Sequence, residues 1–202
     1  MFERNRLTRV MAWTLAAGVV IFAVASCGKK ESATEETKEN ATSEAAKPAL
    51  SDANIAAIVV AANTADIDNG EQAAAKTKNA EVKAFAALMV SDHGSVNNKA
   101  AALAAKLSLT PEDNDTSRNL KASQDSIRAA IKLKTGSDFN KAYIDNEVTY
   151  HQTVLDAIDQ TLIPNAQNAE LKQLLTDVRP TIAAHLDHAK SIQAKLSGTA
   201  AK

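Results

Sequence analysis

The chain has 202 residues and a formal net charge of −1, with 23 Lys and Arg against 24 Asp and Glu. This balance, without a basic stripe or interleaved aromatic residues, excludes nucleic acid as the expected partner. Aromatic residues make up only 3% of the chain, so we expect a core of Ala, Leu, Ile and Val, which suits closely packed long helices.

The N-terminal stretch has the pattern of a bacterial lipoprotein signal. MFERNRLTR is positively charged, and the apolar run VMAWTLAAGVVIFAVAS is followed directly by Cys27, so residues 24–27 read VASC. This end resembles a lipobox, so we expect residues 1–26 to be a signal peptide and Cys27, the only cysteine, to be lipidated. The alternative is an uncleaved anchor helix. Gly28 stands where an Asp would favour the inner membrane, so we expect the outer membrane, facing the periplasm.

Residues 28–50, GKKESATEETKENATSEAAKPAL, are polar and free of aromatic side chains. Such a stretch cannot bury enough apolar surface to offset the entropy of the chain. We therefore expect residues 27–50 to be the lipidated cysteine and a disordered tether with a reach on the order of 25 Å. The membrane, reached through this anchor, is the partner that the sequence indicates.

From Ser51 onward, apolar residues recur at steps of three and four, which predicts helices. Asn79 and Asn168 each precede an Ala-Glu pair and are expected N-caps, and Pro180 is expected to kink the last helix. No stretch alternates with a period of two, so we expect no sheet. The first expected helix begins at Ser51-Asp52, and the second runs from Asn79 to about Leu107. A shorter helix is expected over 116–134. The last two long helices are expected over 139–162 and from Asn168 to about Leu196.

The order of these helices predicts an all-α domain over residues 51–198. Two long helices are followed by a long connection with its own shorter helix, and then by two more long helices. This is the pattern of a ferritin-like four-helix bundle with a long helical crossover between helices two and three. An up-down-up-down bundle would need a short middle loop instead.

Three of the four histidines fall on the apolar stripes of three different long helices. His93 lies between Met89 and Val96, His151 between Val148 and Leu155, and His185 between Ile182 and Ala189. His188 falls on a polar face. The first long helix contributes Asp66, one turn after Ala62 on its buried stripe.

Counting from the hairpin loops places these side chains at similar depths. Asp66 lies 13 residues before the expected cap of the second helix and His93 lies 14 residues after it, so antiparallel packing brings them level. In the second hairpin, His185 is level with Glu147, and His151 lies one turn nearer the loop. The candidate site therefore contains Asp66, His93 and His185, together with Glu147, His151 or both.

Imidazoles and carboxylates that converge inside a bundle are common ligands of zinc, copper, iron or manganese. The candidate cofactor is therefore a single transition-metal ion, with Asp92, Tyr143, Tyr150 or Glu147 completing the hydrogen bonds of its ligands. The alternative is a buried hydrogen-bond network that fixes the register of the helices. No histidine has Glu three residues before it, so the Glu-x-x-His motif of di-iron bundles is missing and a metal-dependent oxidase is not expected.

Three stretches resemble the motifs of one family. They are VKxFAxxMVxDHxxxN at 82–97, FxxxYxxxxVxxH at 139–151 and PxxxxHLxxA at 180–189. In this order they resemble a bacterial family of exported proteins, catalogued as a domain of unknown function and often labelled predicted outer membrane protein. The resemblance implies a ferritin-like fold but no established activity, substrate or metal.

The chain departs from that family's pattern at three positions. Asp66, Asn140 and Glu147 stand where the family usually has Glu, Asp and Met. Asp66 is shorter than the usual residue by one methylene, and Glu147 adds an acid that the pattern does not require.

These observations predict a lipid-anchored protein of the cell envelope whose bundle holds a buried His/Asp centre. We expect this centre to serve metal binding or protection of the envelope under stress rather than fast turnover. The alternative is a structural or interaction bundle whose histidines form a hydrogen-bond network.

Overall fold

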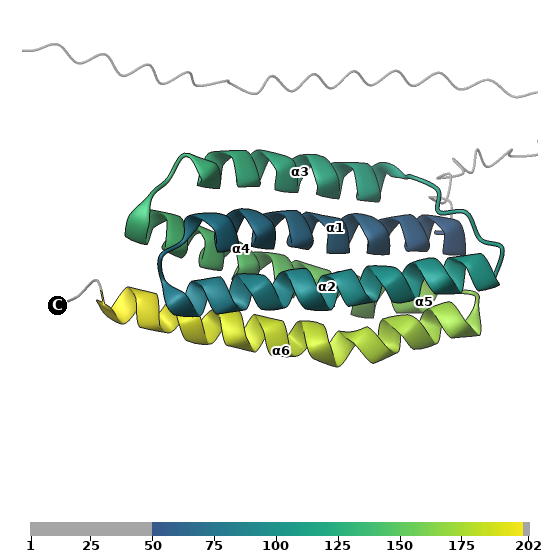
Figure 1. Ribbon diagram of the computed structural model, residues 1–202. Helices are drawn as coiled ribbons and strands as arrows, with labels where there is room; N and C mark the ends of the chain where they lie inside the picture. The colour runs from purple at the N-terminus through teal and green to yellow at the C-terminus, as the bar shows by residue number, and fades with distance from the viewer. Residues whose placement is uncertain (1–49, 200–202) are drawn as a thin grey trace, which may run out of the picture. The chain divides into compact units, whose positions relative to one another are not determined.

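The computed structural model describes residues 50–199, and every regular element in this range is a helix (Figure 1). This confirms the predicted all-α fold. The predicted signal peptide, Cys27 and residues 28–49 of the predicted tether lie outside the described residues. None of the described helices combines the length and the hydropathy that a membrane span requires.

The first hairpin consists of α1 (Asp52–Lys76) and α2 (Ala80–Lys106), which pack against each other in opposite directions (Figure 1). Their starts are confirmed. The side chains of Ser51 and Asn79 each accept a hydrogen bond from the backbone N–H three residues further on. These caps satisfy N–H groups that have no partner inside the helix.

Gly70 marks a close contact between α1 and α2. A Cβ at this position would lie 2.8 Å from the carbonyl oxygen of Ala86 and 3.0 Å from a methyl group of Val90. The glycine therefore does not end α1. It allows the two backbones to approach, and α1 continues to Lys76.

The crossover carries α3 (Asp115–Lys132), which packs along α1. Its start is a capping box, in which the Asn114 side chain accepts from the Ser117 N–H and the Ser117 hydroxyl accepts from the Asn114 N–H. A buried hydrogen bond of 3.1 Å from the Asn69 amide to the Gln124 carbonyl oxygen joins α3 to α1. The long helical crossover is therefore present as predicted.

The second hairpin begins with α4 (Gly136–Ala157), three residues before the predicted start. Gly136 has a φ of +55°, a conformation that favours glycine. The prediction of one regular helix as far as Leu162 is wrong in its last part. There the chain forms a π-helix, η1 (Ile158–Leu162), followed by the short α5 (Ile163–Asn165).

The last helix, α6 (Ala169–Thr199), packs against α4 and completes the second hairpin. Figure 1 shows that α6 bends along its length, and the helix contains Pro180, which has no N–H to donate to the preceding turn. Because α6 also packs against α2, and α4 against α1, the four long helices enclose one core. This arrangement fits the predicted ferritin-like bundle.

Two apolar clusters fill this core. The aromatic cluster contains Ala73, Val82, Phe85, Ala86, Met89, Ile131, Phe139, Tyr143, Ile144, Ala189 and Ile192. The aliphatic cluster contains Ile55, Ile58, Val59, Leu155, Ile158, Leu162, Ala166, Leu171, Leu175, Ile182 and Leu186. On α1 and α4 the candidate site residues lie between members of these two clusters, and on α6 His185 lies beside Ile182 and Leu186 of the aliphatic cluster and precedes Ala189 of the aromatic cluster.

Candidate metal centre

All five candidate residues point into the core, one or two from each long helix. Asp66 lies on α1, His93 on α2, Glu147 and His151 on α4, and His185 on α6, and each is buried with at most 4% of its surface exposed. The sequence left open whether the site contains Glu147, His151 or both. In the structure both side chains lie beside the other three. We call these five residues the His/Asp cluster.

The three imidazoles form a compact triangle. The ring centroids lie 5.7 Å apart for His93 and His151, 5.4 Å for His93 and His185, and 5.5 Å for His151 and His185. Each of the three rings offers a nitrogen within 4.8 Å of the others, and Asp66, Glu147 and His151 form a second such group. Because both groups contain His151, the five side chains make one continuous site.

The outer nitrogen of His93 is fixed by a residue that the sequence analysis missed. His93 Nδ1 lies 2.7 Å from Asn63 Oδ1, and the Asn63 amide nitrogen donates to the Val59 carbonyl oxygen at 2.8 Å. This second bond orients the amide so that its oxygen faces the ring. His93 Nδ1 must therefore carry a proton, so in the neutral ring the lone pair is on Nε2.

The other two imidazoles are oriented in the same way. His151 Nδ1 lies 3.0 Å from the backbone carbonyl oxygen of Glu147, and His185 Nε2 lies 3.0 Å from Asp92 Oδ2. Both partners only accept hydrogen bonds, so these nitrogens are the donors. The inner nitrogens, His151 Nε2 and His185 Nδ1, then present lone pairs to the core.

The atoms that face the centre of the cluster have no hydrogen-bond partner among residues 50–199. They are His93 Nε2, His151 Nε2, His185 Nδ1, both oxygens of Asp66, both oxygens of Glu147 and the hydroxyl of Tyr143. Buried polar atoms are normally paired, because an unpaired one loses its hydration without compensation.

Two short contacts join imidazoles to the carboxylate of Asp66. His93 Nε2 lies 2.9 Å from Asp66 Oδ2, and His151 Nε2 lies 3.4 Å from the same oxygen. A positive charge at these nitrogens, whether from a proton or from a bound cation, attracts the carboxylate.

Burial sets the charges of the cluster. Burial raises the pKa of Asp66, but the imidazoles of His93 and His151 outweigh it and hold that pKa below its ordinary value of 3.8. Burial and then the negative charge of Asp66 raise the pKa of Glu147 well above 4.5. Burial lowers the pKa of His151 and of His185 below 6.5. The cluster thus favours a carboxylate at Asp66, a protonated Glu147, and neutral rings at His151 and His185.

The predicted supporting residues have different places. Asp92 orients His185, as described, and the backbone oxygen rather than the carboxyl group of Glu147 is the one that orients His151. The Tyr150 hydroxyl donates to the Ala62 carbonyl oxygen at 2.8 Å. His188 is exposed, as predicted, and its ring contacts Phe85 at a centroid distance of 5.2 Å.

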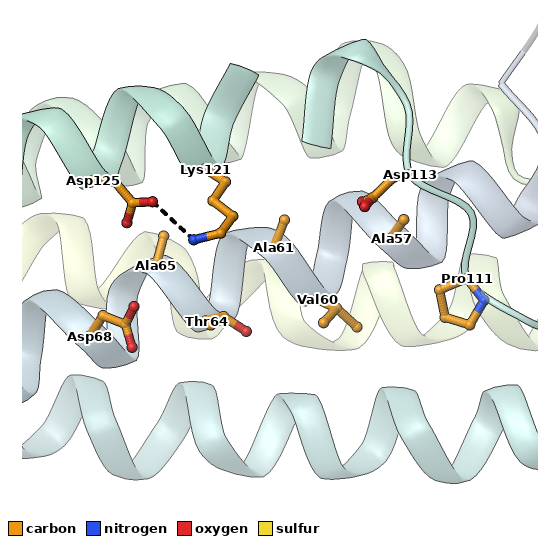
Figure 2. Close-up of a pocket in the computed structure, with 10 residues that line it drawn as sticks. All are labelled: Ala57, Val60, Ala61, Thr64, Ala65, Asp68, Pro111, Asp113, Lys121 and Asp125. Atoms are coloured by element: carbon orange, nitrogen blue, oxygen red, sulfur yellow. Dashed lines mark hydrogen bonds and ion pairs between the residues drawn. The ribbon is translucent and has the colours of Figure 1, made fainter. Parts of the chain in front are cut away.

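A separate hollow of about 300 Å³ lies between α1 and α3 (Figure 2). Small residues of α1, among them Ala57, Ala61 and Ala65, form one side of it, and Lys121 at its rim pairs with Asp125 at 2.9 Å. No residue of the His/Asp cluster lines this hollow, so it is not part of the candidate metal centre.

The comparisons with known proteins identify one family. The sequence profile described as "Domain of unknown function (DUF4142)" matches residues 37–192. No curated protein and no solved structure matches the chain.

Proposed function

Because the chain belongs to the DUF4142 family, a domain of unknown function, we propose its function from the geometry of the site: the bundle binds a single transition-metal ion in the His/Asp cluster. The ligands are His93 Nε2, His151 Nε2, His185 Nδ1 and the carboxylate of Asp66.

One observation carries this proposal. Each imidazole gives its outer nitrogen to a fixed oxygen acceptor and turns its unprotonated nitrogen toward the other two. Metal-bound histidines have this arrangement, in which the outer N–H bond sets the tautomer and the ring orientation. A network built only to hold helix register would instead use both nitrogens of each ring.

The donor set limits the choice of ion. Three imidazole nitrogens and one carboxylate oxygen suit zinc, copper, iron or manganese, whereas calcium and magnesium prefer oxygen ligands throughout. Asp66 supplies a negative charge that offsets part of the charge of a divalent ion inside a dry core. Glu147 adds a second oxygen donor near His151 that becomes a ligand if it gives up its proton.

The arrangement favours one ion and a binding role. Carboxylate-bridged di-iron bundles use a Glu-x-x-His motif on each of two helices, and the residues three positions before the cluster histidines are Val90, Val148 and Ile182. We include in the proposal a lipid anchor at Cys27 that places the bundle at the outer membrane, facing the periplasm. There it would hold metal or protect the envelope during stress.

The test is elemental analysis of the protein purified from the membrane fraction without a histidine tag or chelator, before and after dialysis against each of the four metals. We expect one ion per chain for the preferred metal. His93→Ala and His185→Ala should lose it, and Asn63→Leu should bind about 10–100-fold more weakly, as is typical when the partner of a ligand is removed.

His188→Ala is the matched control, because His188 lies on α6 one turn from His185 but outside the cluster. It should keep the full metal content. Absence of metal in the parent protein, with His93→Ala reducing only the free energy of unfolding, would overturn the proposal in favour of the structural network.

A further inference from the structure

A second internal feature adjoins the His/Asp cluster. It is a cavity of about 150 Å³ lined almost entirely by apolar side chains. Ile58, Ile158, Leu162, Leu175 and Ile182, all members of the aliphatic cluster, form much of its wall.

The cavity lies one helical turn from the cluster on all four long helices. The wall residues concerned are Asn63, Val96, Val154 and Ile182, each three positions from Asp66, His93, His151 and His185 respectively. In antiparallel helices these steps all lead toward the same end of the bundle. The cavity is therefore the next layer of the core, directly beside the cluster.

The π-helix forms part of this cavity. Ile158 and Leu162, the first and last residues of η1, both line it. An empty apolar cavity is unfavourable, because its lining atoms lose the dispersion contacts that a packed core provides. π-Helical turns are rare and are frequently found at functional sites, so a cavity built around one is a candidate binding site.

The wall defines the chemistry of the occupant. It contains no charged side chain, and its buried polar residue, Asn63, already bonds to Val59 and His93. Two exposed threonines, Thr116 of α3 and Thr153 of α4, also line the cavity, so the route to solvent lies between these helices. An occupant gains apolar contacts here but finds no charge to pair with.

We propose that this cavity binds a small, uncharged, apolar molecule of up to about the size of benzene. Apolar cavities of about 150 Å³ can take benzene or xenon, and this one is reached from solvent past Thr116 and Thr153. The occupant lies against Asn63, whose oxygen accepts the hydrogen bond of the His93 ring. Binding in the cavity therefore changes the surroundings of His93. This inference does not require a metal in the cluster.

The test uses methyl and imidazole NMR spectra of the metal-free, full-length protein titrated with benzene. Saturable shifts are expected for the methyl groups of Ile58 and Ile158 and for the His93 ring. Ala157→Leu places a larger side chain in the cavity wall and should weaken benzene binding by about tenfold or more. Ala122→Leu, on an exposed face of α3, should leave it unchanged.

Val178→Phe fills the same cavity from α6 and serves if Ala157→Leu does not fold. Unsaturable or uniformly small shifts in the parent protein would overturn the proposal, as would equal benzene binding by a folded, cavity-filled variant. The metal proposal is unaffected by either result, since the benzene titration contains no metal.

Discussion

The two apolar clusters that flank the His/Asp cluster differ in how completely they are packed. In the aromatic cluster, Phe85, Ile144 and Ile192 are fully buried, and Phe85 meets Tyr143 edge to face at 6.3 Å. In the aliphatic cluster, Ile158 and several neighbours face a cavity, and α4 changes to a π-helix.

The two ends of the core therefore provide different surroundings for the polar residues between them. The aromatic cluster keeps the carboxyl groups of Asp66 and Glu147 fully buried, with Tyr143 beside them. The aliphatic cluster leaves room beside Asn63 and the histidines. The polar layer thus adjoins closely packed side chains on the side of the aromatic cluster and a cavity of about 150 Å³ on the side of the aliphatic cluster.

The largest expected effect is on the free energy of unfolding, when either of two isoleucines of α6 on opposite sides of His185 is replaced by alanine. Ile192 belongs to the aromatic cluster with 0% exposure, whereas Ile182 lines the cavity. Ile192→Ala should lower the free energy of unfolding by about 3–4 kcal/mol and Ile182→Ala by about 2 kcal/mol, because Ile182 already lacks some packing partners. Urea denaturation of the metal-free proteins measures both.

Equal losses in the two variants would show that the two clusters are packed alike. Circular dichroism checks that both variants keep their helices. Benzene should recover part of the stability of Ile182→Ala but none of that of Ile192→Ala, since only the first variant enlarges the cavity.

A pair of glycines tests the packing on the side of the aromatic cluster, at the contact between α1 and α2. A Cβ on Gly70 meets the Ala86 carbonyl oxygen at 2.8 Å, whereas a Cβ on Gly94 meets nothing within 4 Å. Gly70→Ala should cost about 1–3 kcal/mol by forcing the helices apart. Gly94→Ala should instead stabilise by about 0.5–1 kcal/mol, because alanine is the better helix former.

Thermal unfolding of the two variants shows directly whether each substitution stabilises or destabilises the protein. A stabilising Gly70→Ala would mean that α1 and α2 separate without loss and that the aromatic cluster tolerates expansion. The metal content of Gly94→Ala should match the parent protein, although Gly94 follows His93 in the sequence.

The candidate site was predictable from the sequence where the chain is regular. Asp66 and His93 are joined by two α-helices and a short loop, so counting residues from the loop gave their common depth. The apolar stripes placed His151 and His185 on the core side of their helices. Asn63 was also within reach, because an Asn one turn before Asp66 on a buried face is itself a signal.

Two features were beyond the sequence. The π-helix changes the rotation per residue near the end of α4, so counting back from Pro164 left the choice between Glu147 and His151 open. The tautomers depend on atoms rather than on residue spacing. Only the positions of Asn63 and Asp92 show which nitrogens of His93 and His185 face outward, and this orientation is what supports the proposed metal centre over a hydrogen-bond network.

The pH dependence of stability tests whether the aromatic cluster keeps the carboxyl groups dry. The pKa values of His151 and His185 are lowered below 6.5, so the unfolded chain takes up protons there first and stability falls as the pH drops below 6.5. The pKa of Glu147 is raised above 4.5, so the unfolded chain loses that proton first and stability falls as the pH rises. Below pH 6.5 the two histidines outweigh the one glutamate.

The metal-free protein should therefore be most stable near pH 6.5. Above this pH the free energy of unfolding should decline by about 1.4 kcal/mol per pH unit until Glu147 ionises in the folded state. Urea denaturation at a series of pH values measures the slope, and Glu147→Gln should remove the decline. A flat profile above pH 6.5 in the parent protein would mean that Glu147 ionises as an exposed residue does. Water would then reach the carboxyl groups, and the contrast between the two clusters would not hold.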